Sequence, residues 1–518
     1  MRLKKVKLLN FRGYGESEWI DFDAITALVG KNNVGKSTIL DALDVFFNES
    51  EASSADVNIN ADRDEFEIHC AFECDKDIVV DESVPTNLKE ELVLNKSGLL
   101  DVYKRYAFPK KSGSAKIEIG LVANYPICEE YKDVFVKTQH DLQTMAKKLK
   151  LDGSLTENVA IRKAIRQHFG KLLKERREVE ISLSNKDGKR RWDGVCAELP
   201  IYELFKADRT NDEKDTEIQN PIRGEIKKCL GREDVKAKLR EITDIVNESV
   251  KPVLENALAK MKEMDSPLVT DLKSEYQKID TTKWADAFKG ITLKDAHGIS
   301  IGKHGSGMRR MFLLNFFRAS ADRKRTAEND ERDMIYAIEE PETAQHCDFQ
   351  RMLINALGKM TESPHNQVIL TTHSAIVVAQ LGIEKIRLLY KKDGVVRFDM
   401  IEQCVLTEGE ISTNEVNYLV FGECGEAYHD ELFAYLVGKE SPDGRIPELF
   451  KTMLQPKKLW KRDDKPVIER DENYSLSYYV RNYMHHSNTK LNDRYTSEEL
   501  KVSIRAMRSY ISKTYLHK

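Results

Sequence analysis

The stretch GKNNVGKST, residues 30–38, constrains the fold of this chain more than any other feature. Gly30, Gly35, Lys36 and Ser37 satisfy the pattern GxxxxGK[ST], and an apolar run over residues 25–29 precedes them. The glycines allow a tight turn whose backbone N–H groups point at phosphate oxygens. Lys36 can then reach the β- and γ-phosphates, and the Ser37 hydroxyl can ligate Mg²⁺. The sequence therefore predicts an α/β fold in which a buried strand, a phosphate-binding loop and a helix follow one another.

Two further apolar runs lie far downstream and end in polar side chains suited to phosphate chemistry. Residues 334–338 (MIYAI) precede Glu339 and Glu340, and residues 367–372 (QVILTT) precede His373. One carboxylate at a strand end can hold Mg²⁺ through water, a second can polarise an attacking water, and a histidine can contact the γ-phosphate. Taken singly, each motif is also typical of a solvated strand end, so their common order along the chain carries the interpretation.

In this order the motifs resemble the ABC-type ATPase head that SMC-like, RecF-like and OLD-family proteins share. Glu339 and Glu340 match the metal-binding and hydrolysis carboxylates, and His373 matches the switch histidine. The glycine-rich loop at 302–307, followed by a predicted helix, matches the signature loop through Ser306 and Gly307. The resemblance implies ATP and Mg²⁺ as ligands, with Ser37 and Glu339 at the metal. The residues that match the phosphate loop are Gly30, Asn32, Asn33, Gly35, Lys36, Ser37 and Thr38.

The resemblance also has departures and a mechanical consequence. The signature reads GSGM instead of LSGGQ, the first carboxylate is Glu instead of Asp, and no glutamine loop is evident. In such heads the signature loop of one subunit closes over the ATP held by another. A homo-oligomer built from ATP-sandwich dimers is therefore implied.

The remaining segments predict the domain organisation. Residues 66–74 and 116–122 alternate apolar and polar side chains, as strands of an antiparallel sheet do. Charged segments with helical spacing predict a helical insert, with a short coiled-coil arm as one form of it. Within it, Lys186–Asp187–Gly188 predicts a hairpin turn, and the basic residues before Trp192 leave a nucleic-acid contact open. The predicted domains are 1–130 and 291–405 for the head, 131–290 for the insert, and 406–518 for a helical carboxy-terminal domain.

The carboxy-terminal segment carries a second candidate site. RNYMHH, residues 481–486, resembles the motif of HEPN ribonucleases, which implies Arg481, Asn482 and His486 as RNA-cleaving residues. A purely structural helical tail fits equally well, because Thr496-x-x-Glu499 is a capping box before an apolar-spaced helix. An acidic pair suited to a TOPRIM nuclease is not evident, since Glu408–Gly409–Glu410 lacks a following DxD motif.

Composition excludes some classes of function. The formal net charge is −4, so no global basic field attracts nucleic acid, and the eight cysteines show no CxxC spacing of a metal site. No apolar run approaches a membrane span, and the basic amino-terminal residues lack the core of a signal peptide. These patterns predict a cytoplasmic protein with no membrane contact.

The resemblance implies a specific biological role. It points to an ATP-binding and hydrolysing subunit of a bacterial antiphage defence complex, similar to Septu, PARIS or abortive-infection ATPase subunits. Such a subunit senses infection and controls a toxic nuclease effector, which is usually a separate protein. Two alternatives stay open: a self-contained, ATP-regulated HEPN-type ribonuclease similar to anticodon nucleases, and a RecF-like DNA-repair ATPase.

Overall fold

The computed structural model describes most of the chain outside its middle third. The described residues are 1–48, 52–80, 84–109, 115–151, 156–184, 186–206, 229–230, 232–239, 241, 332–343, 345–392, 395–399, 404–406, 412–441, 448–452, 456–461, 471–486 and 492–516. The chain divides into two compact units, Met1–Ala207 with Arg323–Lys518, and Asp208–Asp322. All the elements named below belong to the first unit.

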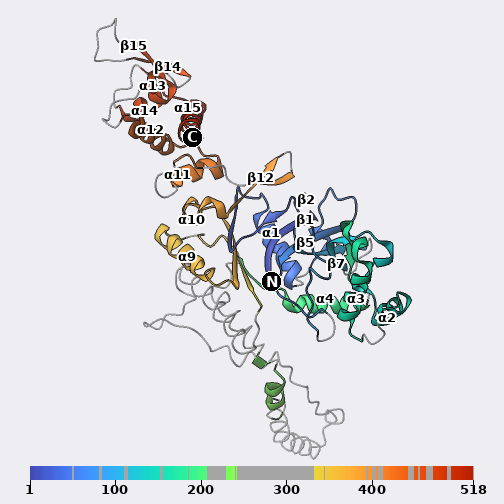
Figure 1. Ribbon diagram of the computed structural model, residues 1–518. Helices are drawn as coiled ribbons and strands as arrows, with labels where there is room; N and C mark the ends of the chain where they lie inside the picture. Colours follow the sequence, from blue (N-terminus) through green and yellow to red (C-terminus); the bar gives the residue numbers. More distant parts are fainter. Residues whose placement is uncertain are drawn as a thin grey trace, which may run out of the picture. The chain divides into compact units, whose positions relative to one another are not determined.

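A seven-stranded sheet, here sheet A, carries most of the amino-terminal residues (Figure 1). Every pair of neighbouring strands in it is antiparallel, and the order is β2-β1-β5-β6-β7-β8 with β3 on β1. The two alternating segments predicted as strands are confirmed as β5 and β7. The strands are β1 (Arg2–Phe11), β2 (Tyr14–Glu16), β3 (Ile20–Asp21), β5 (Glu65–Glu73), β6 (Leu100–Ala107), β7 (Lys116–Pro126) and β8 (Arg176–Ser182).

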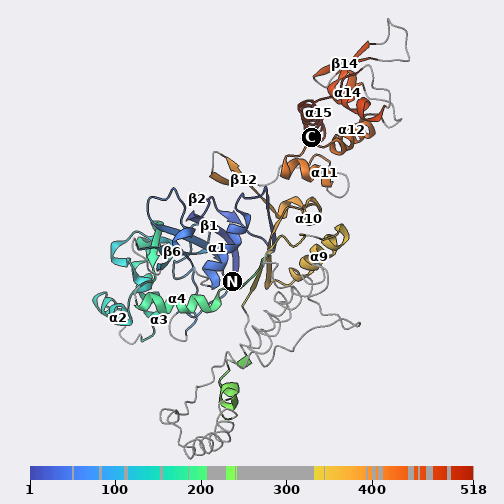
Figure 2. The same ribbon diagram turned by 180° about the vertical axis from the view of Figure 1, so that it is seen from behind.

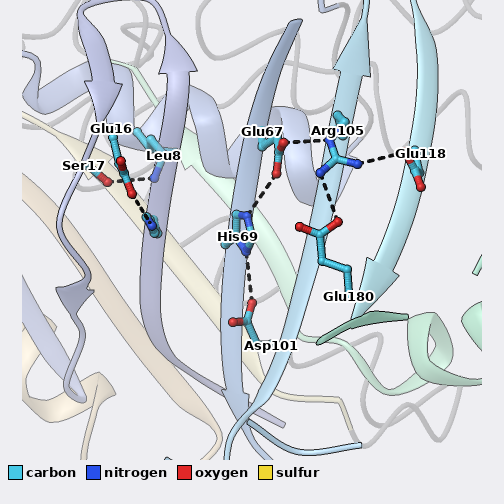
Figure 3. Close-up of polar contacts among 10 residues, drawn as sticks. Leu8, Glu16, Ser17, Glu67, His69, Asp101, Arg105, Glu118 and Glu180 are labelled. Atoms are coloured by element: carbon cyan, nitrogen blue, oxygen red, sulfur yellow. Dashed lines mark hydrogen bonds and ion pairs between the residues drawn. The ribbon is translucent and has the colours of Figure 1, made fainter. Parts of the chain in front are cut away.

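One face of sheet A is polar and carries a row of ion pairs between strands (Figure 3). The Arg105 guanidinium donates to Glu67 on β5 and to Glu118 and Glu180 on β7 and β8, at 2.7 to 3.2 Å. Alternation along each strand sends apolar residues such as Phe66 and Ile68 to the other face, where both are fully buried. Sheet A therefore has one face in the core and one face lined with charges.

A six-stranded sheet, here sheet B, contains the segments predicted to carry the chemistry. Its order is β13-β12-β4-β11-β10-β9, and all neighbours are parallel except the hairpin of β12 and β13. The predicted strands before the phosphate loop, before Glu339 and before His373 are confirmed as β4, β10 and β11, and β12 and β13 form an antiparallel hairpin. The strands are β4 (Ile25–Gly30), β9 (Ile201–Phe205), β10 (Met334–Glu339), β11 (Asn366–Thr372), β12 (Ile386–Lys392) and β13 (Val395–Asp399).

The helix after the phosphate loop, α1 (Lys36–Asn48), lies between the two sheets (Figure 1). Lys104 and Tyr106 of β6 donate hydrogen bonds to the carbonyl oxygens of Phe46 and Val45, at 2.8 and 3.2 Å. These donors satisfy carbonyls that the end of a helix leaves unpaired. On the other side, the Tyr202 hydroxyl of β9 donates to Leu40 O at 2.7 Å. The helix is thereby fixed to both sheets, and its amino end is held at the phosphate loop.

Three helices follow β7 and pack on the hydrophobic core that also contains α1 and the apolar face of sheet A (Figure 2). They are α2 (Gln139–Lys148), α3 (Asn158–Phe169) and α4 (Lys186–Glu198). The hairpin predicted around residues 186–188 is wrong, because that segment begins α4. Arg191, Trp192 and Val195 are buried at helical spacing, and Gly194 brings the helix against the backbone of Val79 and Val80. Tertiary packing thus overrides the local turn propensity, and Arg191 and Trp192 are unavailable as a nucleic-acid surface.

Two strands lie inside the segment predicted to be helical. β8 belongs to sheet A and β9 belongs to sheet B. The prediction of a helical insert is therefore wrong at residues 176–182 and 201–205. The candidate coiled-coil arm falls outside the described residues.

The carboxy-terminal residues form a separate hydrophobic core, in which Tyr428, Leu432 and Ile504 are fully buried. The predicted capping box is confirmed at the start of α15, but a hairpin of β14 and β15 interrupts the predicted helical tail. The described part of the chain contains no helix long and apolar enough to cross a bilayer. The remaining helices and strands of the first unit, in chain order, are α9 (Cys347–Met360), α10 (Ala375–Leu381), α11 (Thr413–Val416), α12 (Glu426–Glu440), α13 (Leu449–Thr452), β14 (Lys457–Lys461), β15 (Asp471–Ser475), α14 (Leu476–His485) and α15 (Ser497–Ile511).

Candidate functional site

The register of sheet B brings the predicted site residues to one edge. Val29 at the end of β4 pairs with Thr372 of β11, and Thr371 pairs with Glu339 of β10. The carboxyl ends of these parallel strands therefore coincide, which is where ligands bind in open α/β sheets. A pocket of about 620 Å³ lies there, lined by Gly13, Asn32, Asn33, Val34, Gly35, Lys36, Ser37, Thr38, Glu340, His373, Lys391 and Val396.

Both glycines of the phosphate loop are required by the backbone. Gly30 has φ +155°, and a Cβ atom there would lie 2.3 Å from the carbonyl oxygen of Leu389 on β12. Gly35 has φ +108°, and a Cβ atom there would lie 2.9 Å from the Tyr14 hydroxyl. That hydroxyl donates a hydrogen bond to Gly35 O at 2.9 Å. The loop therefore packs closely against β12 on one side and Tyr14 on the other. The hydrogen bond from Tyr14 supports the loop, and the sequence alone did not predict it.

Lys36 is buried in the pocket and contacts both the loop and the opposite strand. Its Nζ donates to the carbonyl oxygens of Gly30 and Lys31 at 3.0 and 3.1 Å, and it lies 2.7 Å from Nε2 of His373. Burial lowers the pKa of Lys36, although the nearby carboxylates of Glu340, Glu342 and Glu339 act in the opposite direction. The ammonium is therefore placed among anions and oriented over the loop, where phosphate oxygens would replace its carbonyl partners.

One ring nitrogen of His373 lies close to both a cation and an anion. Its Nε2 is 2.7 Å from Lys36 Nζ and 2.8 Å from Glu340 Oε1. Burial and the charge of Lys36 lower the pKa of His373, although Glu340 and Glu342 oppose this shift. A lowered pKa favours the neutral ring, whose Nε2 can accept a hydrogen bond from Lys36 in one tautomer or donate one to Glu340 in the other, but not both at once. The predicted switch histidine is thereby coupled directly to the predicted hydrolysis residue.

Glu340 lines the pocket, while its neighbour Glu339 does not. Glu340 follows the end of β10 with φ +39°, and its N–H lies 3.1 Å from both the carbonyl and the hydroxyl oxygen of Thr371. This conformation turns the Glu340 side chain toward His373. Glu339 remains in β10 as a half-buried residue whose charge still acts on Lys36. The structure therefore brings Glu340, His373 and Lys36 together, and Glu339 is not part of the pocket lining.

Glu342 is a component of this site that sequence reasoning missed. Its Oε1 accepts hydrogen bonds from the Thr372 hydroxyl at 2.6 Å and from His373 N at 2.7 Å. The residue is buried, and its Oε2 atom has no hydrogen-bond partner within the described residues. Glu342 thus holds the backbone of His373 in place. The only signal in the sequence is its position two residues after Glu340.

The pocket fits a nucleoside phosphate. Backbone N–H groups at the start of α1, together with Lys36, offer hydrogen bonds and positive charge to phosphate oxygens. Ser37, which carries a hydroxyl, and Glu340, which carries a carboxylate, both line the pocket, and these are oxygen ligands that Mg²⁺ accepts. Within the described residues, no group of three or more His, Cys, Asp or Glu side chains forms a metal site of its own. Any Mg²⁺ here would therefore depend on the phosphates for further ligands.

Ser306 and Gly307, the predicted signature residues, lie outside the described residues, as do Glu408–Gly409–Glu410. The candidate ribonuclease residues are described: Arg481 Nη1 donates a hydrogen bond to Asn482 Oδ1 at 3.4 Å, and the His486 ring lies beside the Trp460 ring, with centroids 6.4 Å apart. Arg481 lies over the Phe433 ring at 5.7 Å, Asn482 is buried, and His486 follows the last residue of α14. His485 is the histidine on the Arg481 face, and its Nε2 lies 2.9 Å from Asp430 Oδ2.

Residues 1–378 of the chain match the AAA ATPase domain family. The chain belongs to this family. The family match covers sheet A, the phosphate loop, Glu340, His373 and four strands of sheet B, while β12 and β13 lie beyond it. The prediction of a nucleotide-binding ATPase domain is therefore confirmed at this level. The ABC-type assignment within it stays a prediction. No curated protein matches the chain.

Among solved structures, the AAA ATPase domain has weak likenesses to SMC heads. The SmcHead bound to the C-winged helix domain of ScpA has 13% identity over 77% of this chain and 97% of that chain, with a TM-score of 0.33. The SMC head domain from Thermotoga maritima has 15% identity over 78% and 100%, with a TM-score of 0.29. The Smc head domain with an extended coiled coil, bound to the C-terminal domain of ScpA derived from Pyrococcus furiosus, has 11% identity over 77% and 96%, with a TM-score of 0.31. Likenesses this weak support no conclusion about function.

Proposed function

We propose that this chain binds ATP with Mg²⁺ and hydrolyses the γ-phosphate bond in the pocket at the edge of sheet B. The observation that carries the proposal is the direct contact of His373 with both Lys36 and Glu340 beside the phosphate loop. A cation for phosphate, a carboxylate for water and a histidine between them lie around one pocket. The AAA ATPase domain family supports the same assignment.

Each residue has a role that follows from its position. Lys36 binds the β- and γ-phosphates once it leaves the carbonyl oxygens of the loop. Glu340 orients and polarises the attacking water, and His373 contacts the γ-phosphate. Ser37 would hold Mg²⁺, and Glu339, which does not line the pocket, would hold it through a water molecule; when bound, the ion neutralises charge on the phosphates. Glu342 keeps the His373 backbone fixed, so that the ring can respond to the γ-phosphate.

The proposal includes a dimer that closes on ATP. Ser306 and Gly307 of one subunit would complete the pocket of another, and binding energy from both faces would drive closure. At the level of the cell, we propose an antiphage defence complex in which this ATPase senses infection and controls a separate nuclease effector. Support for that role comes from the order of the motifs and their resemblance to such ATPase subunits.

Substitution Glu340→Gln tests the catalytic assignment. Gln retains the shape of the side chain but is a far weaker base, so ATP turnover should fall by about 100-fold or more while ATP binding persists. ATPase rate and calorimetric ATP affinity are the measurements, and native mass should show a dimer trapped by ATP. The exposed Glu362 is the matched control, because Glu362→Gln should change neither quantity. Unchanged turnover in the Glu340 variant would remove this residue from catalysis.

A second experiment separates the proposed role from its rivals. Purified chain should leave tRNA intact, and DNA should not stimulate its ATPase rate. Cleavage of tRNA that is lost in His486→Ala, with ATP turnover unchanged, would instead support a self-contained ribonuclease. DNA-stimulated hydrolysis would support a repair ATPase.

A further inference from the structure

The hairpin of β12 and β13 forms a wall of the nucleotide pocket on the far side of the phosphate loop from His373. Lys391 of β12 and Val396 of β13 line the pocket, and they are directly paired across the hairpin. Paired residues of an antiparallel hairpin project to the same face, so both side chains point toward the same space. Lys392, the next residue, projects to the opposite face.

The strand order gives the pocket two chemically different ends. β4, which carries the loop, lies between β11 and β12 in sheet B. His373 follows β11, and Glu340 follows β10 on its far side, so the hydrolytic groups stand at one end. Gly13, Lys391 and Val396 stand at the other end. If the proposed function holds, the γ-phosphate lies toward His373, and the α-phosphate and nucleoside must extend toward the hairpin.

The hairpin is fixed to the phosphate loop through one aromatic contact. The ring of Phe398 on β13 stacks on Tyr14, with centroids 6.0 Å apart and planes 6° apart. Tyr14 donates its hydroxyl proton to Gly35 O. The wall that carries Lys391 is therefore held at a defined position relative to the loop, and the long lysine side chain needs no loop closure to reach the pocket.

We propose that Lys391 binds the α-phosphate of the nucleotide and so sets the direction in which the triphosphate lies. Lys36 supplies the positive charge at the β- and γ-phosphates, which leaves the charge of the α-phosphate to a second cation. Lys391 has no carboxylate partner within the described residues, and lysine binds phosphate as a point charge. Gly13 has no side chain and Val396 is apolar, so this end of the pocket has room for the sugar and the base and presents an apolar surface to them. This assignment rests on the proposed function.

The test compares Lys391→Met with Lys392→Met in the full chain, using calorimetric titrations with ADP, ATP and GTP in the presence of Mg²⁺. Methionine keeps the unbranched shape and most of the length of the side chain but removes its charge. In Lys391→Met the affinities for all three nucleotides should fall by the same factor, about ten-fold, as expected for the loss of one charge-assisted hydrogen bond. Lys392→Met should stay within about two-fold of the wild type, because an exposed charge on the other face contributes little.

The outcomes separate the inference from the function on which it rests. Binding by the wild type that is lost in Lys36→Ala supports the nucleotide site itself. Given that result, unchanged affinities in Lys391→Met would overturn the role of Lys391. A lower affinity for ATP with an unchanged affinity for ADP would place Lys391 at the γ-phosphate and overturn the proposed direction of the triphosphate. A changed ratio of GTP to ATP affinity would make Lys391 a base contact instead. A wild type that binds no nucleotide would refute the proposed function and the inference together.

Discussion

The buried carboxylate of Glu342 connects the end of β10 to the backbone of His373 although it does not line the pocket. Replacing it with leucine would leave the N–H of His373 and the hydroxyl of Thr372 without an acceptor. An unpaired buried donor costs about 1–3 kcal/mol, so kcat should fall roughly ten-fold or more as His373 shifts. KM for ATP should stay near the wild-type value, because Glu342 has no place in the pocket lining.

Substitution Glu342→Gln is the matched variant for this prediction. Its side-chain carbonyl oxygen can still accept from Thr372 and His373, so it should restore most of the lost kcat. Steady-state ATPase kinetics and a thermal melt of each variant are the measurements. Equal losses in the Gln and Leu variants would show that the negative charge acts, and a raised KM would show that Glu342 binds the nucleotide.

The sequence predicted the residues of the site that follow apolar runs and missed those that act through the fold. Lys36, Glu340 and His373 could be found because each ends or follows a recognisable strand. Tyr14 and Glu342 act on residues distant in the chain, Gly35 and His373. Such contacts appear only when strand order and register are known. Lys391 was missed for the same reason, because the parallel pairing of β12 with β4 brings it to the pocket.

Among the secondary-structure elements, the strands of sheet B were predictable because each is a short, continuous apolar run. The segment at 186–198 was not, because Lys186–Asp187–Gly188 has turn chemistry and its burial pattern depends on distant partners. Arg191 donates to the carbonyl oxygen of Lys137, and Lys104 lies over the Trp192 ring. Two members of the basic and aromatic cluster, Arg191 and Trp192, are therefore interior residues of α4, while Lys189 and Arg190 are exposed.

The pairing of β5 with β6 contains a pH-sensitive contact (Figure 3). His69 lies between Asp101 and Glu67, with both ring nitrogens 3.3 Å from carboxylate oxygens, and the Trp19 and Tyr103 rings pack beside it. Carboxylates only accept, so the imidazole satisfies both when it is doubly protonated. Burial alone would lower the pKa of His69, but the hydrogen bonds and charges of Asp101 and Glu67 outweigh it, and the pKa is raised.

The raised pKa predicts how stability depends on pH. The folded chain holds the His69 proton at pH values where the unfolded chain, with a pKa of about 6.5, has lost it. The stabilisation is therefore complete below about pH 6.5 and is lost as pH rises through the folded pKa. Thermal midpoints measured from pH 6 to 9 should decline more for the wild type than for His69→Gln. The exposed His140 is the control, since His140→Gln should keep the wild-type slope. Parallel curves for the wild type and His69→Gln would contradict the prediction.

A long stretch of chain separates two parts of the AAA ATPase domain that are neighbours in sheet B. β9 and β10 are parallel neighbours, with Ile201 opposite Met334 and Phe205 near Ile338 in register. The chain between them includes Asp208–Asp322, a compact unit of its own. A parallel crossover needs only about a dozen residues. Sheet B can therefore form without that unit, whereas Ser306 and Gly307 belong to it.

Replacing residues 208–322 with a Gly/Ser linker of about 12 residues should separate binding from turnover. The pocket lining in the described residues lies wholly outside the removed unit, so ATP affinity should stay within a few-fold of the wild type. Hydrolysis should fall by about 100-fold, the loss expected when preorganised donors to the phosphates are removed, and the ATP-dependent dimer should disappear. Calorimetry, ATPase rate and native mass measure the three quantities. Full turnover in this variant would exclude the 302–307 loop from catalysis, because no copy of it could then reach the phosphates of a partner.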